Sequence, residues 1–392
     1  MSESRDSIRL LGMMTGTSCD ALDGACIEIR DGKWHPLWSF TRAYPRDLRK
    51  RVLEIQRPGT RASLREILEL NRDLGNWYAA CAERALRGRP APQLPHAIAN
   101  HGQTIAHHPA GGARGCTLQA GDPARIATKT GLTVISSFRD GDMAAGGEGA
   151  PLLPLFHQWI VRSRLERARG VSIHNLGGIS NLTYIPPRGE PLAFDTGPAN
   201  ALIDAAVEEV TRGKQRYDRG GRLARAGRID DRGLAAALKH PYFARPAPKS
   251  TGRDDFPWEW FRRQTRARGE DLVATATALT VESVARAYER FVLKKGLPLE
   301  RVYLCGGGAR NPVLLRGLSK RLPTVQIAPI SALGLDEQLI EAQGFAYFGF
   351  LSLLGRAVGG SWTGVKGWAP PGHIIPGENW LTLLDRIRRV RS

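Results

Sequence analysis

The sequence has few cysteines and no long apolar run. Its five cysteines form no Cys-x-x-Cys pair and their number is odd, so neither a disulfide framework nor a zinc site is predicted. The apolar run at positions 8–11 is interrupted by Arg9, and no segment approaches the roughly 20 apolar residues that cross a bilayer. These absences predict a cytoplasmic protein in a reducing compartment, with no membrane partner.

Acidic residues are scarce relative to basic ones. The chain carries 38 Asp and Glu against 56 Lys and Arg, a formal net charge of +18. Only 10 of the basic residues are lysine, and the arginines are spread from Arg5 to Arg391 without interleaved aromatic residues. A nucleic-acid groove concentrates basic and aromatic residues on one face, so no nucleic-acid partner is predicted. The charge favours small anionic ligands in general.

Apolar segments that alternate with amphipathic ones predict a mixed α/β protein. Strands are predicted at 10–14, 25–30, 34–40, 96–100 and 132–136, and again at 171–176, 179–185, 192–194 and 302–305. Helices are predicted from Ser63, at 198–210, at 271–295, after Asn311 and lastly at 336–354, and 211–252 is expected to be irregular.

The helix that begins after Ser63 has a capping-box pattern, because Glu66 follows three residues later. Its apolar face is expected to comprise Leu64, Ile67, Leu68, Leu74, Trp77 and Tyr78.

Both halves of the chain open on a hairpin that turns at glycine, which predicts two similar domains. A length of 392 residues is sufficient for two. The glycine-rich segment 137–150 marks the expected boundary, giving domains 1–137 and 138–392, with the final residues free to pack back onto the first domain. A cleft between two such domains is where a ligand is expected.

A turn of small and polar residues follows the first predicted strand. It consists of Gly16, Thr17, Ser18, Cys19, Asp20, Ala21, Leu22 and Asp23. Such a turn exposes N–H groups and hydroxyls to a phosphate, and the carboxylate of Asp20 suits a magnesium ion. The same composition is typical of an ordinary hairpin turn, so the residues alone leave both interpretations open.

Two further glycine turns each follow an apolar strand. They contain Gly177 and Gly178 in one case, and Gly306, Gly307, Gly308 and Asn311 in the other. Three such turns indicate nucleotide binding through backbone N–H groups. None matches the P-loop or a Gly-x-Gly-x-x-Gly turn after a first strand, so neither of those nucleotide-binding folds is predicted.

Asp195 follows an apolar segment and precedes a predicted helix with Pro198 at an early position. A carboxylate at that place suits a general base. The alternative is that Asp195 or Thr196 only caps the helix.

Polar loops after two other strands carry groups that bind sugar hydroxyls or a carboxylate through paired hydrogen bonds. These groups are His101, Gln103, Thr104, Arg139 and Asp142. His101, His107 and His108 have no cysteine or carboxylate at metal-site spacing, so they are not predicted to bind a metal. The basic segment 249–253 is expected to be a solvated loop.

Together the motifs resemble those of the anhydro-N-acetylmuramic acid kinases. In chain order they are GTSCDALD, HGQT, FRDGDMAAGGEGAPL, NLGGISNL, FDTGPAN, PAPKSTGR, CGGGARNP and EAQGFAY, the last with Glu341. The resemblance covers essentially the whole chain. It implies an α/β fold of two ribonuclease-H-like domains with an interdomain active-site cleft, in a kinase of amino sugar metabolism and peptidoglycan recycling.

The resemblance also implies roles for the residues identified above. The three glycine turns would bind ATP, with Asp20 and Glu341 near Mg²⁺, and the polar loops would contact the sugar. Asp195 would take a proton from the water that attacks C1 of 1,6-anhydro-N-acetylmuramic acid, while O6 of the opening bridge accepts the γ-phosphoryl group. Positioning and charge stabilisation are what a protein contributes to such a transfer.

Three positions depart from the family pattern. Ala21 stands where the family usually has Gly, Glu148 where it has Gln, and Ser137 where it often has Asp. Ala21 matters only if the turn requires a positive φ, and Glu148 adds a charge near the expected site.

Two alternatives remain open from the sequence. A levoglucosan kinase performs the same chemistry on a smaller sugar and shares these motifs. A nucleotide-binding protein without turnover is the other, and the joint presence of Asp20, Asp195 and Glu341 argues against it. The sequence leaves the choice between monomer and homodimer open.

Overall fold

The computed structural model describes residues 7–57, 59–109, 114–165 and 168–391. The chain divides into two compact units, residues 1–163 with 338–392 and residues 164–337. The predicted boundary after residue 137 therefore falls inside the first unit. Asp142 accepts a hydrogen bond from Thr363, and Gly141 lies against the main chain of Pro370, which ties the glycine-rich segment into that unit.

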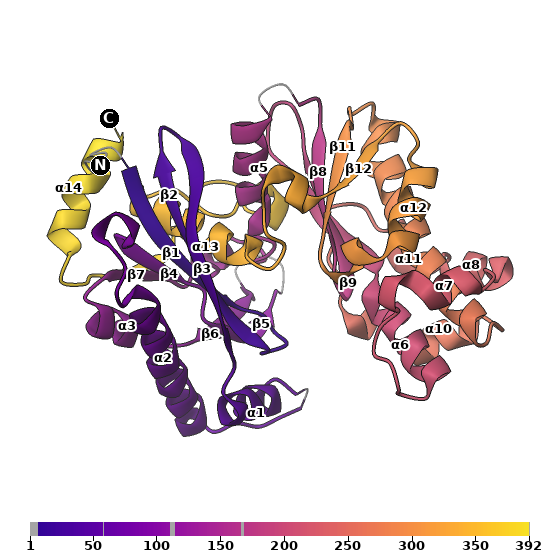
Figure 1. The fold of residues 1–392 in the computed structure, drawn as a ribbon, viewed down its shortest axis with the longest axis horizontal. Coiled ribbons are helices and arrows are strands. Elements are labelled where there is room, and N and C mark those ends of the chain that lie inside the picture. The colour runs from indigo at the N-terminus through magenta and orange to yellow at the C-terminus, as the bar shows by residue number, and fades with distance from the viewer. Residues whose placement is uncertain (1–6, 58, 110–113, 166–167, 392) are drawn as a thin grey trace. The chain divides into compact units, whose positions relative to one another are not determined.

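The first unit contains a six-stranded sheet in the order β13-β7-β4-β1-β2-β3 (Figure 1). Its strands are β1 (Ser7–Thr15), β2 (Ala21–Arg30), β3 (Lys33–Ala43), β4 (Ala97–Asn100), β7 (Thr133–Ser136) and β13 (His373–Ile375). The first three form an antiparallel meander, β4 runs parallel to β1 and β7, and β13 is antiparallel to β7. A separate hairpin joins β5 (Gln103–His108) and β6 (Cys116–Ala120).

Helices cover both faces of this sheet. The helices of this unit are α1 (Arg46–Ile55), α2 (Leu64–Leu86), α3 (Pro123–Thr130), α4 (Asp140–Ala144), α5 (Leu153–Arg164), α13 (Ile340–Leu353) and α14 (Trp380–Arg391). Side chains alternate along β1, so Leu11 and Met13 join the core beneath α2, while Gly12 lies against the backbone of Ala342 in α13. A side chain at Gly12 would separate α13 from the sheet.

The capping box at Ser63 and Glu66 is confirmed, since each side chain bonds the other residue's backbone N–H. The predicted apolar face of α2 is wrong at its start, because Leu64 is 72% exposed and Leu68 is 58% exposed. Ile67 is partly buried, and the first fully buried residue of the helix is Leu70.

The second unit repeats the same sheet plan. Its strands are β8 (Val171–Leu176), β9 (Ile179–Ile185), β10 (Leu192–Pro198), β11 (Arg301–Cys305) and β12 (Gln326–Pro329). Their order is β10-β9-β8-β11-β12, with an antiparallel meander followed by two parallel strands. The first unit has the same order and directions in β3-β2-β1-β4-β7. The predicted duplication of a ribonuclease-H-like sheet is confirmed.

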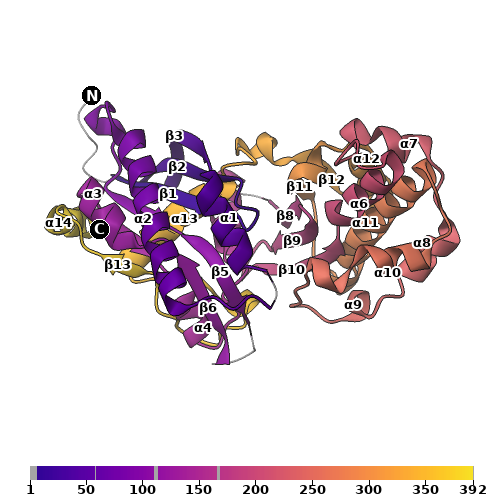
Figure 2. The ribbon, with the colours of Figure 1, turned by 90° about the horizontal axis from the view of Figure 1, so that it is seen from below.

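The helices of the second unit gather around one long, almost fully buried helix, α11 (Figure 2). The central helix α11 comprises Glu270–Phe291. The other helices are α6 (Asn200–Thr211), α7 (Arg222–Ala226), α8 (Asp231–Ala237), α9 (Pro241–Ala244), α10 (Trp258–Gln264) and α12 (Pro312–Arg321). The expectation that 211–252 is irregular is wrong, because three short helices lie there and pack their apolar residues on α11 and its neighbours.

The predicted final helix at 336–354 begins only at Ile340, and it is not the last. Helix α14 follows, with Leu383 and Ile387 buried. In the described part of the chain, no helix is both long enough and apolar enough to cross a membrane.

Candidate functional site

The turn between β1 and β2 is compact and partly exposed. The N–H of Cys19 donates to the Gly16 carbonyl at 3.1 Å, and Cys19 adopts a positive φ of 54° with its side chain buried. Ser18 and Asp20 project to solvent. Ala21 already lies in β2, opposite Ala43. The left-handed residue is therefore Cys19, so alanine at 21 causes no backbone strain.

Buried polar side chains support this turn from below. Gln103, fully buried, donates from Nε2 to the Gly16 carbonyl at 3.3 Å and accepts from the Tyr44 hydroxyl at 3.3 Å. The hydroxyls of Thr15 and Tyr78 are 3.0 Å apart. Gln103 thus positions the turn, and Thr104 is only partly buried beside it.

Arg49 is a cation beside the turn that the sequence analysis missed. It donates from Nε to the Cys19 carbonyl at 3.0 Å and pairs with the Asp20 carboxylate at 3.2 Å. The Asp20 side chain remains 70% exposed. No sequence signal reveals this contact, because α1 is brought to the turn only by the path of β3.

His101 and Arg139 form a buried polar pair in the same unit. Arg139 donates from Nε to Nε2 of His101 at 3.1 Å and from a terminal nitrogen to the Gly149 carbonyl at 2.8 Å. Since Nε2 accepts, the ring proton lies on Nδ1, which is 2.9 Å from the Gly102 carbonyl. Burial and the neighbouring Arg139 charge lower the pKa of His101 well below its usual value. The imidazole is therefore neutral and orients the guanidinium.

Glu341 lies in the first turn of α13, and its side chain reaches solvent. Loss of hydration next to the surrounding protein raises the pKa of Glu341. The charge of Arg139 opposes this rise, and the carboxylate of Asp23 adds to the rise. The structure thus couples Glu341 to Asp23 and Arg139. In the described ranges, no three His, Cys, Asp or Glu side chains gather as a metal-binding group.

Asp142 is 1% exposed, and both of its carboxylate oxygens are engaged. Oδ1 accepts from the Thr363 hydroxyl at 2.6 Å and Oδ2 accepts from the N–H of Gly149 at 2.7 Å. Burial raises the pKa of Asp142, and these two bonds oppose the rise. Because Gly149 also binds Arg139, Asp142 positions the guanidinium through the loop. Thr363 carried no sequence signal.

The two glycine turns of the second unit lie side by side. The carbonyls of Gly177 and Gly178 accept from the N–H groups of Asn200 and Ala199, each at 3.0 Å. Gly306 and Gly308 pack on the neighbouring β8 end so closely that a Cβ at either would collide with it. Small residues are therefore required here for close approach of two backbones.

Asn311 follows the second glycine turn and caps α12. Its Oδ1 accepts from the N–H of Val313 at 3.0 Å, and the side chain is 8% exposed. Pro312 occupies the first helical position, as is common after a cap. Asn311 fixes the end of the glycine turn.

Asp195 lies within β10, at a bulge between Asp195 and Gly197. The alternative that Asp195 or Thr196 caps the next helix is wrong, because β10 continues to Pro198 and α6 has no side-chain cap. Asp195 Oδ2 accepts from the N–H of Thr251 at 2.9 Å. Burial raises the pKa of Asp195 to about 6, and the Thr251 bond and the Lys249 charge oppose that rise.

The segment around Lys249 supports Asp195 from a second side. The Lys249 carbonyl accepts from the N–H of Asp195 at 3.0 Å, and the Tyr242 hydroxyl donates to the Asp195 carbonyl at 2.6 Å. The Lys249 ammonium donates to the Tyr242 carbonyl at 3.1 Å. The expectation of a solvated loop is wrong at Lys249 and Thr251, which are partly buried, while Ser250 and Gly252 are exposed. The family motif PAPKSTGR contains Lys249 and Thr251, and it was the sequence feature that could have indicated this contact with Asp195.

The comparisons of sequence indicate one family. The sequence matches the family model described as "Anhydro-N-acetylmuramic acid kinase" over residues 8–375. A protein of that name from Gloeobacter violaceus is 40% identical over 364 residues, covering 89% of this chain and 93% of its own. Another from Streptomyces coelicolor is 39% identical over 386 residues and covers 96% of each chain. A solved ROK hexokinase from Thermus thermophilus aligns with 87% of this chain and 98% of its own, at 14% identity and a TM-score of 0.42.

Proposed function

The chain belongs to the anhydro-N-acetylmuramic acid kinase family, and we propose that it uses ATP to open 1,6-anhydro-N-acetylmuramic acid and phosphorylate O6. The products are N-acetylmuramic acid 6-phosphate and ADP, in the recycling of cell-wall amino sugars. The observation that carries the proposal is Asp195, a partly buried carboxylate fixed by Thr251 with a pKa of about 6.

Asp195 acts as the general base. At neutral pH a carboxyl group with a pKa near 6 is mostly ionised, yet it is more basic than an exposed one. It takes a proton from water as the water oxygen bonds to C1 of the sugar. The bond between C1 and O6 breaks, O6 bonds to the γ-phosphorus, and ADP leaves. The proton on Asp195 is then released to solvent.

Arg139 binds oxygen atoms of the sugar. Its bonds to His101 and Gly149 use two of the five N–H donors of a guanidinium, which leaves further donors in a fixed orientation. Asp142, Gln103 and His101 act as positioning residues. Their buried polar groups are satisfied within the protein, so their role is to hold neighbouring groups in place.

The nucleotide is bound by the glycine turns. The turn after β1 offers exposed N–H and hydroxyl groups at Thr17 and Ser18, and the turns at 177–178 and 306–308 provide close backbone approach. Within 306–308, Gly307 is the most open position, since a Cβ there would meet only Asn200 at 3.6 Å. These features fit phosphate oxygens.

The exposed Asp20 and the accessible Glu341 fit a magnesium ion, because Mg²⁺ binds through one or two carboxylates, waters and substrate phosphates. The ion would neutralise charge on the transferred phosphoryl group.

All five cysteines are free thiols, and four of them are buried. Cysteines that remain free thiols favour a reducing location, the cytoplasm.

The test is a sugar-dependent ADP-release assay run in ¹⁸O-labelled water and quenched within minutes. We expect ADP and phosphosugar in equal amounts, with the label in the C1 hydroxyl. ADP release that is independent of the sugar, or label recovered in free phosphate, would contradict the proposal.

A further inference from the structure

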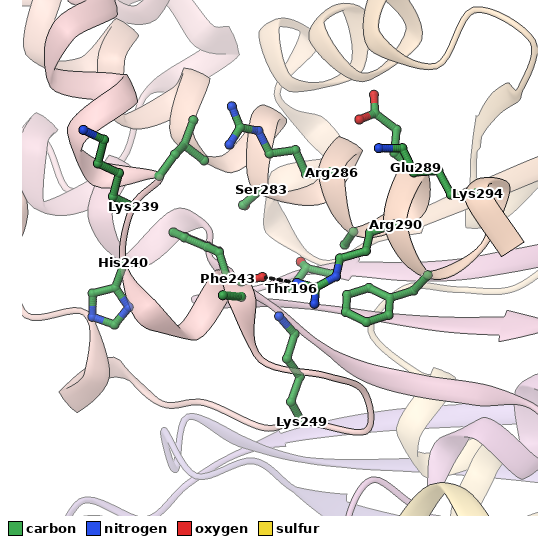
Figure 3. Close-up of a pocket in the computed structure, with 14 residues that line it drawn as sticks. Thr196, Lys239, His240, Phe243, Lys249, Ser283, Arg286, Glu289, Arg290 and Lys294 are labelled. Atoms are coloured by element: carbon green, nitrogen blue, oxygen red, sulfur yellow. Dashed lines mark hydrogen bonds between the residues drawn. The ribbon is translucent and has the colours of Figure 1, made fainter.

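A pocket of about 470 Å³ lies in the second unit, between β10, α11 and the segment that joins α8 to α9 (Figure 3). A volume of this size is typical of sites for small molecules. None of its lining residues belongs to the glycine turns or the sugar-contacting groups described above. The pocket therefore includes none of the proposed nucleotide and sugar contacts, and it adjoins the proposed base Asp195 through Thr196 and Lys249.

Five cations line this pocket. They are Lys239, Lys249, Arg286, Arg290 and Lys294. Figure 3 shows that Lys249 enters from the loop on one side and that Arg286, Arg290 and Lys294 project from the opposite helix and its extension. Among the described lining residues Glu289 is the one acid, and it pairs with Arg321 at 2.9 Å. Arg286 also pairs with Glu282, which lies outside the lining, at 3.7 Å. The lining therefore carries a net positive charge, to which Lys239, Lys249, Arg290 and Lys294 contribute without an ion-pair partner in the described ranges.

Stabilisation by the helix dipole explains the presence of only some of these cations. Arg290 lies in the last turn of α11 and Lys294 lies just after the helix, where the helix dipole stabilises a cation by about 0.3–1 kcal/mol. Arg286 lies a full turn earlier, and Lys239 and Lys249 belong to other segments, so the dipole does not explain them. Like charges four residues apart on a helix destabilise it.

The like charges act on one another across the pocket. Burial, Arg290 and Arg245 together lower the pKa of Lys249 to about 8, in spite of the opposing charge of Asp195. Arg290 donates to the Phe243 carbonyl at 3.1 Å, and no carboxylate within the described ranges pairs with Lys239 or Lys294. A bound anion would relieve this repulsion.

Most of the remaining lining is apolar. Its apolar members are Leu238, Phe243, Ala244, Ala287 and Phe291, and its polar members are Thr196, His240 and Ser283. A compact dianion can be bound by several cations at once, and an attached carbon skeleton would pack against the apolar walls. We propose that this pocket is a binding site for a small phosphomonoester.

The experiment is calorimetric titration of the full chain, with saturating ADP to fill the nucleotide site. The probes are glucose 6-phosphate, inorganic phosphate and glucose. Glucose 6-phosphate is expected to bind at least about tenfold more tightly than inorganic phosphate, because it adds contact with the apolar walls. Glucose is expected to bind at least about tenfold more weakly than the monoester, since it lacks the charge.

The double variant Arg286→Gln with Lys294→Gln is expected to weaken glucose 6-phosphate binding by at least about tenfold, the scale of losing charge-assisted bonds. The matched control is Arg316→Gln with Lys320→Gln, which removes two exposed cations from α12 and is expected to change affinity less than about twofold. Unchanged circular dichroism and ADP affinity show that each variant is folded.

Equal losses in both double variants would show a general field effect and would overturn the site. Equal affinities for the monoester and inorganic phosphate, or for the monoester and glucose, would also overturn it. The sugar-kinase reaction is tested separately by ADP release, so either proposal can fail alone.

Discussion

The N–H of Thr251 donates a 2.9 Å hydrogen bond to Oδ2 of Asp195. This bond joins a strand residue to a loop 56 positions away in the chain. Burial disfavours the charged form of the Asp195 carboxyl group, and this hydrogen bond stabilises that charged form. Asp195 is therefore held in one orientation with its pKa between that of an exposed carboxyl group and neutrality.

Replacing the proposed base tests its role directly. Asp195→Asn preserves the shape and can still accept the Thr251 N–H, but it cannot take a proton. We expect turnover to fall by at least about 100-fold, the scale of general-base loss, with ADP affinity nearly unchanged. Asp231→Asn, at an exposed position in α8, is the control. Near-normal turnover in Asp195→Asn would remove the residue from catalysis.

The same carboxyl group sets a pH dependence. The pKa of Asp195 is raised to about 6 by burial, so kcat/KM is expected to fall as pH drops below about 6 and the base is protonated. A profile flat from pH 5 to 8 would contradict this assignment. The measurement is initial ADP release across that range, with ADP affinity measured at each pH.

Stability is expected to depend on pH in the opposite sense. A carboxyl group whose pKa is higher in the folded protein than in the unfolded chain destabilises the fold once it ionises, between about pH 4 and pH 6. Asp195→Asn should therefore raise the melting temperature at pH 7.5, by about 2–4 °C for about 1 kcal/mol. The gain should disappear near pH 4, and a gain that is constant with pH would argue against the raised pKa.

Thr363 is expected to be important for the first unit. Its hydroxyl donates to the buried carboxylate of Asp142 at 2.6 Å, so Thr363→Val leaves one oxygen unsatisfied at a cost of about 1–3 kcal/mol. Thr363→Ser keeps the donor and serves as the control. Melting curves of both variants test this, and equal melting temperatures would show that the hydroxyl is dispensable.

The proposed magnesium contacts are tested by Asp20→Ala and Glu341→Ala. Because carboxylates are the expected protein ligands of Mg²⁺, each variant should need a higher magnesium concentration for half-maximal turnover. Asp31→Ala, at the exposed turn after β2, controls for charge loss. Magnesium titrations that match the unsubstituted protein in both variants would remove these residues from the metal site.

Substrate preference separates the two related activities. The muramic acid sugar carries a carboxylate, and one charge-assisted bond to it is worth about 1.5–3 kcal/mol. We expect kcat/KM for 1,6-anhydro-N-acetylmuramic acid to exceed that for levoglucosan at least about tenfold. The ratio should survive added salt better than the rate, since a desolvated contact is screened less. A preference for levoglucosan would reassign the substrate.

Local patterns predicted much of the fold. The hairpins at β1–β2 and β8–β9 and the capping box at Ser63 depend on residues close in sequence, and hydrophobic patterning indicates structure over such short stretches. The exposed start of α2 and the helices within 211–252 were missed. Which side of a helix is buried, and whether a short helix forms at all, depend on packing partners distant in sequence.

The sequence by itself determined the duplicated α/β plan, the family and the identity of the residues at the glycine turns and at Asp195. The tertiary structure decided which contacts those residues make. It placed Asp195 at a bulge beneath Thr251, gave Asp142 and Gln103 internal partners, and gathered the five cations of the pocket in the second unit. Hydrogen bonding, burial and charge repulsion act through space, and the folded chain brings together groups that the sequence keeps far apart.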